Sequence, residues 1–346
     1  MSFNVTVQPS GRTYTANADE ALLAAAIRSG IGLPYGCKDG ACGSCKCKKI
    51  EGSVVHGPHQ LKALSHEEEA AGFILTCCGV AHSDVVIESR QVTDESAFPV
   101  KRMPARLSSF AKASHDVMVM RLQLPAADVF KYHAGQYVEF LLRDGDRRAY
   151  SMGNAPHTQL DNASIELHIR HMPGGKFTDH VFGAMKEKEI MRVEGPFGSF
   201  YLREDSTKPM VLLASGTGFA PIKAIIEHMQ FKRITRPAVL YWGGRRPADL
   251  YMHDWVMARV AEMPNLRYVP VISDALPEDA WTGRTGFVHQ AVLQDLPDLS
   301  AYQVYACGAP IVVDSAQADY IAAGLPDDEF FADSFVTEKE KAQAVT

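Results

Sequence analysis

The sequence predicts a multidomain protein that joins α+β and α/β folds, and three observations carry this prediction. A cluster of cysteines lies in a β-rich N-terminal part of the 346-residue chain. Short alternating strands separated by glycine and proline follow over residues 103–204, which is typical of an antiparallel barrel. After Lys208 and Pro209 apolar strands alternate with helices, which indicates a doubly wound parallel sheet.

These patterns divide the chain into five segments. Residues 93–102 lose their periodicity and contain a proline, so they are predicted to be a linker. The tail is expected to be frayed. The segments are therefore 1–92, the linker 93–102, 103–204, 205–336 and the tail 337–346.

The N-terminal segment should open with a β-hairpin and a helix. Residues 3–7 and 13–16 alternate between apolar and polar on either side of a turn. A helix is expected over residues 21–27, capped by Asp19 or a neighbour and ended by Gly30.

A second, shorter helix and a closing strand complete this segment. Ser65 and Glu68 form the pattern of a capping box. The acidic run 67–69 is expected to be a solvated helix start that suits the helix dipole, with a docking patch for a basic partner as the alternative. Residues 85–87 should close the domain as a strand.

Four of the seven cysteines form a metal-ligand pattern. Cys37, Cys42 and Cys45 have the spacing C-x4-C-x2-C, and Cys77 follows in a separate segment. This is the ligand pattern of a plant-type [2Fe-2S] cluster. Small residues inside the loop let backbone N–H groups approach the sulfurs, which tunes such a cluster. A zinc site and four inert thiols are the alternatives, whereas the odd cysteine count disfavours disulfides.

Cys47 and Cys78 are out of register with this pattern and are expected to be spectators. Neighbouring residues on an extended chain point to opposite faces, so only one of residues 77 and 78 should reach the cluster. Cys77 is the expected ligand because Leu75, Thr76 and Cys77 resemble the Leu-Thr-Cys segment that carries the fourth ligand in ferredoxins.

A flavin site is predicted in the barrel. Strands are expected there at residues 117–124, 136–142, 165–170 and 190–193. Arg148 and Tyr150 share a face of one strand, so a guanidinium can bind a pyrophosphate while a phenol ring packs on a fused ring. The glycine turn 174–175 opens a helix whose free N–H groups favour phosphate. Either signal alone is weak, and together they reinforce each other.

Arg148, Tyr150 and Ser151, the Gly-Gly-x-x-Thr turn at 174–178, and residues 195–198 resemble the flavin domain of the ferredoxin-NADP reductase superfamily. This resemblance implies that Tyr150 packs on the isoalloxazine of FAD and that Ser151 lies near flavin N5. The implied pyrophosphate site consists of Arg148, Gly174, Gly175, Lys176 and Thr178.

The resemblance also places the strand with His168, Ile169 and Arg170 on the adenine side of FAD, where backbone groups often contribute. For the side chains of His168 and His171, a surface or core position is preferred to any catalytic role.

A nicotinamide site is predicted where an apolar strand meets a helix. Gly216, Thr217, Gly218 and Pro221 form a G-T-G-x-x-P turn, which lacks the third glycine of the usual fingerprint but still permits close approach by a pyrophosphate.

The same superfamily has this turn and a Cys-Gly pair like Cys307 and Gly308, whose cysteine lies near nicotinamide C4. Ser151 and Cys307 are therefore the expected catalytic residues. An isolated thiol such as Cys307 is more often a small buried hydrophobic group.

The choice of coenzyme rests on two opposing observations. Residues 241–245 and 281–286 resemble bacterial flavin reductases and should place Gly243 and Arg245 near the adenosine half. Arg245 and Arg246 could bind a 2′-phosphate, and no clear acidic partner for a ribose diol is visible, which would favour NADPH. Most relatives with an N-terminal ferredoxin domain use NADH, so NADH is expected first and NADPH second.

Phe335 lies in a segment, 331–335, that resembles a C-terminal motif of the same reductases. It is expected to reach the flavin, and a core aromatic is the equally valid alternative.

The composition excludes several classes of partner. A dispersed net charge of −6, without a basic patch interleaved with aromatics, argues against nucleic-acid binding. No apolar run approaches the roughly 18 residues of a membrane span. The start lacks the pattern of a secretory signal. A cytoplasmic protein, monomeric and without membrane or nucleic-acid partners, is expected.

Over nearly the whole chain, the order of domains resembles reductase components of multicomponent oxygenases and, equally, CDP-6-deoxy-Δ3,4-glucoseen reductases. The resemblance implies a β-grasp [2Fe-2S] ferredoxin domain, an FAD barrel and an NAD domain. Electron counting agrees, because a nicotinamide gives two electrons, a cluster accepts one, and a flavin can mediate between them. The electron acceptor would be an oxygenase component or an iron-sulfur sugar dehydrase. A non-enzymatic redox sensor or carrier would leave Arg148, Tyr150, Gly216 and Gly218 unexplained.

Overall fold

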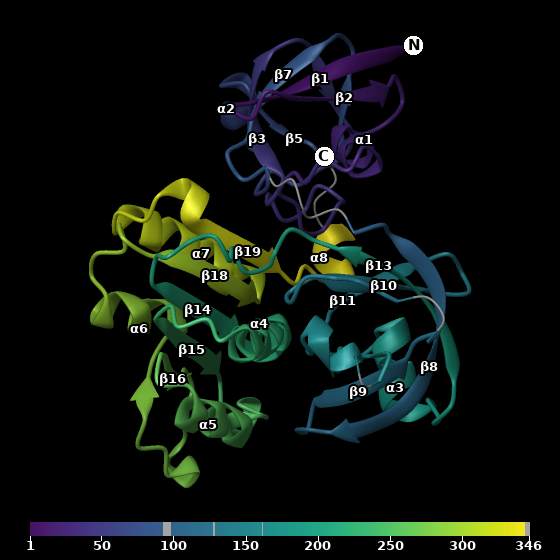
Figure 1. Ribbon diagram of the computed structural model, residues 1–346. Coiled ribbons are helices and arrows are strands. Elements are labelled where there is room, and N and C mark those ends of the chain that lie inside the picture. The colour runs from purple at the N-terminus through teal and green to yellow at the C-terminus, as the bar shows by residue number, and fades with distance from the viewer. Residues whose placement is uncertain (93–97, 127–128, 161, 343–346) are drawn as a thin grey trace. The chain divides into compact units, whose positions relative to one another are not determined.

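The computed structural model describes residues 1–92, 98–126, 129–160 and 162–342 (Figure 1). The chain forms two compact units, one made of residues 1–98 and 332–346 and the other of residues 99–331. Of the predicted linker, residues 93–97 lie outside the described part, and strand β8 begins inside the predicted range, at Lys101.

The first unit is built on a mixed five-stranded sheet with the order β2-β1-β7-β3-β5. Strand β1 pairs antiparallel with β2 and parallel with β7, as expected for a β-grasp fold. The strands are β1 Ser2–Gln8, β2 Arg12–Asn17, β3 Lys46–Glu51, β5 Phe73–Leu75 and β7 Val85–Glu88. A two-stranded sheet consists of β4 Val54–His56 and β6 Gly79–Ala81.

The two N-terminal helices are α1 Leu22–Arg28 and α2 His66–Ala70. The predicted capping box of α2 is present, because Ser65 and Glu68 each accept a hydrogen bond from the other's backbone N–H. The predicted cap of α1 is wrong: Ala21 occupies the N-cap without a side-chain hydrogen bond. The acceptor expected there is used elsewhere, since the neighbouring Glu20 binds Arg28 and Asn17.

The second unit begins with a six-stranded antiparallel sheet of order β11-β10-β13-β8-β9-β12. A bridge between Met152 and Leu167 joins the two ends of this order, which closes the sheet as the sequence predicted. Helix α3 Lys176–Gly183 and the 3-10 turn η1 Pro156–Gln159 accompany it. The strands are β8 Lys101–Lys112, β9 Val117–Gln123, β10 Tyr137–Leu141, β11 Arg147–Ser151, β12 Ser164–Arg170 and β13 Ile190–Phe197.

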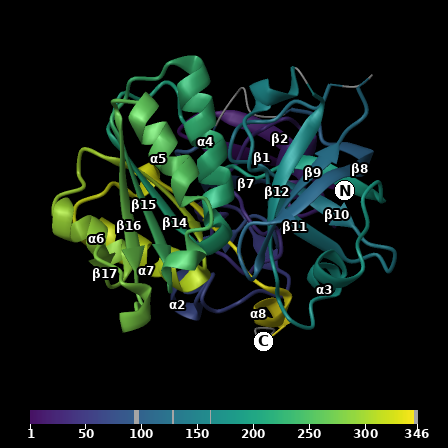
Figure 2. The same ribbon diagram turned by 90° about the horizontal axis from the view of Figure 1, so that it is seen from below.

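A sheet of order β17-β16-β15-β14-β18-β19 follows, and its strands pair in parallel from β17 to β18. Helices α4 and α5 cover one face and α6 and α7 the other (Figures 1 and 2). The helices are α4 Phe219–Lys232, α5 His253–Glu262, α6 Val288–Asp295 and α7 Pro310–Ala322. The strands are β14 Met210–Ser215, β15 Ala238–Gly244, β16 Leu266–Ile272, β17 Arg284–Thr285, β18 Gln303–Gly308 and β19 Phe330–Ser334.

This order confirms the predicted doubly wound sheet and sets the position of a ligand site. The chain moves outward from β14 to β15 and β16, then returns to place β18 on the other side of β14. Ligands of open parallel sheets bind beyond the carboxyl ends of strands where the order reverses. The loops after β14 and β18 are therefore the expected site.

The described tail is helical rather than frayed. Residues Glu338–Ala342 form helix α8, and Thr337 accepts a hydrogen bond from the N–H of Glu340 while its own N–H and hydroxyl donate to that side chain. A threonine and an acidic residue three positions later satisfy the free N–H groups that begin a helix. Thr337 and Glu340 carry this capping signal in the sequence.

Candidate redox site

The four predicted cluster ligands come together in two pairs. The Cys37 N–H and thiol both hydrogen-bond to the sulfur of Cys42, the former at 3.4 Å. The Cys45 thiol donates to Cys77. A [2Fe-2S] cluster has four cysteine ligands and two irons. Four cysteines gathered as two pairs therefore fit this cluster.

The loop between these cysteines has the backbone that such a cluster requires. Gly40 and Gly43 have φ angles of +74° and +78°, in the left-handed region that favours glycine. A Cβ on Gly40 would lie 2.9 Å from the Cβ of His59, so no side chain fits there. The Gly40 N–H donates to Cys77, as expected for amide groups that stabilise thiolate ligands.

The choice between Cys77 and Cys78 rested on an incorrect geometric argument. The two residues lie in a turn, and their thiols hydrogen-bond to each other instead of pointing to opposite faces. The contact with Cys45 is what favours Cys77 as the ligand. Cys47 lies on β3, and burial together with nearby Cys45 raises the pKa of its thiol to about 12.

The C-terminal segment contacts the cluster loop within the first unit. Lys341 in α8 forms an ion pair of 2.5 Å with Asp39, which itself hydrogen-bonds to Cys37. The side-chain amide of Gln60 donates to the carbonyl of Glu340 at 2.8 Å. A lysine is therefore held beside a carboxylate that touches a predicted cluster ligand.

The flavin residues of β11 lie as the alternation predicts. The side chains of Arg148 and Tyr150 are half-buried and those of Arg147 and Ala149 more exposed, while Ser151 is buried. The Tyr150 ring packs on Phe140 and Phe177, with ring centroids 5.7 and 5.4 Å away. Burial raises the pKa of Tyr150, so its phenol is neutral at ordinary pH.

Two predicted phosphate-binding cations converge on one carboxylate. Arg148 Nη2 lies 3.2 Å and Lys176 Nζ 2.8 Å from the same oxygen of Asp146. Lys176 also contacts Asp144 at 2.6 Å. The structure thus brings Arg148 and Lys176 together, which fits an anionic group, although two aspartates already offset their charge.

The glycine turn before α3 is closed by Thr178. Gly174 has a φ of +82°, and a Cβ on Gly175 would lie 2.7 Å from the Thr178 hydroxyl. That hydroxyl donates to the Met172 carbonyl at 2.9 Å. Thr178 therefore shapes the turn, and the phosphate role of Gly174 and Gly175 stays a prediction.

The strand with His168, Ile169 and Arg170 faces the parallel-sheet domain as well as the barrel. Ile169 is fully buried in the barrel core, so its side chain is not available to a cofactor. His168 is a core histidine, as preferred from the sequence. Arg170 donates to Asp116 at 2.9 Å and lies against Gly216 of the predicted nicotinamide loop.

The nicotinamide loop lies beside the Cys-Gly pair at the point where the strand order reverses. Ala214 of β14 is in register with Cys307 of β18. Gly218 has no room for a side chain, because a Cβ would collide with the Cys307 carbonyl. The turn η2 Gly216–Gly218 contains Thr217, which is buried.

The walls of this loop are tightly packed. Trp242 donates from its indole N–H to the Gly216 carbonyl at 3.1 Å and stacks on Phe219 at 3.9 Å. Gly308 has a φ of +133° and lies against Ser215. The Cys307 side chain is buried, with 1% exposure, and its contact with a nicotinamide stays a prediction. Pro221 is buried in the first turn of α4.

A pocket opens beyond β15 and β16, where the sequence predicted the adenosine half. It is lined by His115, Arg245, Arg246, Ala248, Asp249, Asp274 and Asp279. Gly243 ends the strand behind it and packs against Val288. Three aspartates that the sequence did not indicate line this pocket, and a carboxylate partner for a ribose diol stays a prediction.

Phe335 is half-buried and belongs to the first unit, with residues 332–346. Its predicted contact with the flavin stays a prediction.

Three family descriptions match successive parts of the chain. They are a 2Fe-2S iron-sulfur cluster binding domain over residues 5–82, an oxidoreductase FAD-binding domain over 104–201 and an oxidoreductase NAD-binding domain over 212–318. A CDP-6-deoxy-L-threo-D-glycero-4-hexulose-3-dehydrase reductase from Yersinia pseudotuberculosis is 40% identical over 342 residues, covering 98% of this chain and 100% of the relative. This chain belongs to the three-domain iron-sulfur flavoprotein reductases.

The chain is also similar to a reductase component of a dioxygenase and to a cytochrome P450 reductase. Reductase component 1 of terephthalate 1,2-dioxygenase from Comamonas is 33% identical and covers 97% of this chain and 98% of its own. The crystal structure of a cytochrome P450 reductase from Amycolatopsis has a TM-score of 0.77 and 31% identity, covering 97% of this chain and 99% of its own.

The reductase passes electrons from NADH through FAD and a [2Fe-2S] cluster to a partner protein, which confirms the predicted fold class, cofactors and reaction. The flavin supplies the chemistry that converts a two-electron donation into single-electron steps. The protein's part is to bind, orient and shield the reacting groups. None of the described helices is long and apolar enough to cross a membrane.

Sequence analysis missed the buried residues that join the two domains of the second unit. Lys223, Glu166 and Tyr251 are not in any motif that the sequence analysis singled out. One signal was available, because Lys223 interrupts an apolar run, 219–226, at the start of a helix expected to pack on a sheet. A lysine in such a position is buried only with a partner.

The two vicinal cysteines should behave differently when each is replaced. We expect Cys77→Ser to abolish the visible absorbance and the reduced-state EPR signal of the cluster, because Cys77 contacts Cys45 across the loop. Cys78→Ser is the matched control and should retain both signals. A full FAD content shows that each variant is folded. Loss of the cluster signals in Cys78→Ser alone would assign the fourth ligand to Cys78.

The charge of Lys341 should influence the cluster. We expect Lys341→Gln to lower its midpoint potential, because the reduced cluster carries one more negative charge and loses a nearby cation. Spectroelectrochemical titration measures this shift. Lys339, an exposed lysine of the same helix, provides the control variant Lys339→Gln. Equal shifts in the two variants would show that the ion pair with Asp39 has no specific effect.

Proposed function

We propose that the electron acceptor of this reductase is an iron-sulfur dehydrase that acts on a CDP-linked 6-deoxyhexulose. The full-length 40% identity to the Yersinia dehydrase reductase carries this proposal, since the oxygenase reductase component has 33% over a similar span. Part of the acceptor's surface would contact the cluster loop, where transfer distances to the protein exterior are short.

The overall reaction balances with two equivalents of acceptor. NADH gives one hydride, and NAD+ leaves. Two electrons then reach two one-electron acceptors in turn, and one proton is released to solvent. No side chain needs to act as a general base.

A terminal oxygenase component is the second candidate. It is supported by the similarity to the Comamonas reductase component of a dioxygenase and to the Amycolatopsis cytochrome P450 reductase.

A comparison of the two acceptors in separate reactions tests the proposal. The purified reductase, reduced with one equivalent of NADH, is mixed in a stopped-flow instrument with a CDP-6-deoxyhexulose dehydrase or with a terminal dioxygenase. We expect reoxidation of the reductase to be faster with the dehydrase and to yield the deoxygenated sugar product. Cys42→Ser should still be reduced by NADH but fail to transfer electrons. Faster reoxidation by the dioxygenase would favour the second candidate.

We also propose that the adenosine pocket selects NADH over NADPH. Arg246 forms two hydrogen bonds with Asp279, of 2.7 and 2.8 Å, and a longer ion pair with Glu278. The hydrogen bond from Arg246 lowers the pKa of Asp279, so both groups are charged at neutral pH. Asp249 accepts from the N–H groups of Arg245 and Arg246 at 2.8 and 3.2 Å.

The charge of the residues that line the pocket favours NADH over NADPH. Two arginines face three aspartates in the lining of this pocket, so carboxylates outnumber guanidinium groups there. A 2′-phosphate carries about two negative charges at neutral pH and would be repelled. A neutral ribose diol can instead donate to a carboxylate such as Asp274, whose backbone N–H is fixed on the Arg245 carbonyl.

Releasing Arg246 should weaken this selection. We expect Asp279→Asn to lower the ratio of kcat/KM for NADH to that for NADPH by about tenfold, equivalent to about 1.4 kcal/mol. Steady-state reduction of ferricyanide with each coenzyme measures the ratio. Asp205→Asn removes an exposed carboxylate outside the pocket lining and should leave it unchanged. An unchanged ratio in Asp279→Asn would contradict the role given to this ion pair.

A further inference from the structure

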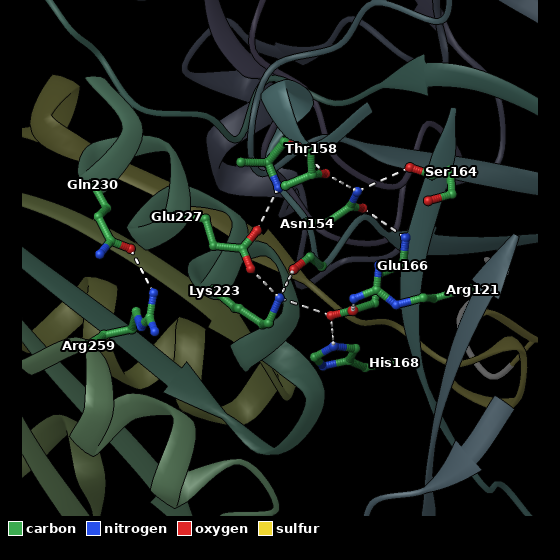
Figure 3. Close-up of polar contacts among 12 residues, drawn as sticks. Arg121, Asn154, Thr158, Ser164, Glu166, His168, Lys223, Glu227, Gln230 and Arg259 are labelled. Atoms are coloured by element: carbon green, nitrogen blue, oxygen red, sulfur yellow. Dashed lines mark hydrogen bonds and ion pairs between the residues drawn. The ribbon is translucent and has the colours of Figure 1, made fainter. Parts of the chain in front are cut away.

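Lys223 of α4 is buried between the parallel-sheet domain and the barrel, with 3% exposure. Its ammonium group has three oxygen neighbours: the Gly153 carbonyl at 2.9 Å and the carboxylates of Glu227 at 2.6 Å and Glu166 at 3.0 Å. Figure 3 shows the contacts with Glu227 and Glu166. Gly153 and Glu166 belong to the barrel, and Glu227 is one turn further along α4. The lysine therefore joins two domains of the same unit.

On the barrel side of this contact, both carboxylate oxygens of Glu166 have partners. One oxygen of Glu166 accepts from Arg121 at 2.6 Å, and the other lies 3.0 Å from both His168 and Lys223. Burial acts to raise the pKa of Glu166, but the hydrogen bond from His168 and the charge of Lys223 outweigh it and hold the pKa at about 2. Glu166 is therefore a carboxylate at all ordinary pH values.

His168 extends the network to a third element. A carboxylate only accepts, so His168 donates from Nε2 to Glu166. Burial lowers the pKa of His168, so its ring is neutral and Nδ1 accepts from the Tyr251 hydroxyl at 2.7 Å. Tyr251 packs edge-on against Trp242, the residue that donates to the Gly216 carbonyl.

Helix α4 forms two hydrogen bonds with residues 153–155, the segment that follows Ser151. Lys223 donates to the Gly153 carbonyl, and Glu227 accepts from the Ala155 N–H at 2.9 Å. Asn154, between them, bonds to the backbone of Ser164 and Glu166 of β12. The segment 153–155 is thus held on both sides.

Through these contacts, only a few residues separate Ser151, expected near the flavin, from Gly218 of the nicotinamide loop. Gly153 is two residues from Ser151, the residue expected near flavin N5. Lys223 is five residues from Gly218, about 7.5 Å along the helix axis, so it is rigidly linked to the nicotinamide loop. A small displacement of reacting groups can lower a rate strongly, because transfer requires close and aligned approach.

The chemical nature of the network also points to positioning rather than stability. Apolar side chains of similar volume often stabilise a buried interface as well as an ion pair does, since charges lose hydration on burial. An ion pair differs in requiring one geometry, because each donor must face its acceptor.

We propose that Lys223 is a positioning residue that fixes the nicotinamide loop relative to the flavin strand. This inference builds on the reductase function proposed above. Lys223 acts through Gly153 and Glu166 and does not touch the reacting atoms.

The variant Lys223→Met tests the proposal, with Lys232→Met as the matched control on an exposed part of the same helix. Stopped-flow absorbance records flavin reduction at saturating NADH. We expect Lys223→Met to lower the limiting rate at least about tenfold and to weaken the long-wavelength charge-transfer absorbance between nicotinamide and flavin. FAD content and flavin midpoint potential should stay at the wild-type values, and Lys232→Met should match the wild type throughout.

A second variant distinguishes a loss of positioning from a failure of Lys223→Met to fold. Lys223→Met leaves the half-buried Glu227 without its cation, so the double variant Lys223→Met/Glu227→Gln removes that charge while its amide oxygen can still accept from Ala155. Lys223→Arg keeps the charge and should recover part of the charge-transfer band. A folded Lys223→Met or double variant with a wild-type limiting rate and charge-transfer band would overturn the proposal. If the wild type itself fails to oxidise NADH, the reductase function fails instead.

Discussion

Nicotinamide coenzymes release two electrons together, whereas a plant-type iron-sulfur cluster accepts one at a time. The order of domains in this chain is suited to this difference in electron number. A flavin must lie between the two, and it must be close to the nicotinamide on one side. The barrel and the parallel sheet meet this requirement as parts of one compact unit. Their junction is therefore the part of the molecule where geometry matters most.

Carboxylates neutralise the cations of the second unit that were predicted to bind phosphate. Arg148 and Lys176 are held by Asp144 and Asp146, and Arg246 by Asp279. Each of these cations has a carboxylate partner, so neither group of side chains carries a net positive charge.

The buried ion pair of Lys223 and Glu166 has a different energetic effect from the more exposed ion pairs described above. Exposed pairs contribute roughly 0–1 kcal/mol each to stability. The pair of Lys223 and Glu166 is almost completely shielded, with 4% exposure for each side chain. Breaking such a pair is costly, so the two domains are held in one mutual orientation. In the first unit, Lys341 and Asp39 are partly shielded and contact the cluster loop instead.

Local patterns in the sequence were enough to predict the C-x4-C-x2-C loop, the two glycine-rich turns and the three kinds of sheet, because each depends on residues close together in the chain. Cysteine spacing, a glycine with positive φ and the apolar period of a strand are local properties. The fold was needed to show that Cys77 and Cys78 share a turn, that aspartates line the pocket beyond β15 and β16, and that Lys223 contacts Glu166. These features join residues from separate elements, and local patterns contain no information about which distant side chains will face each other.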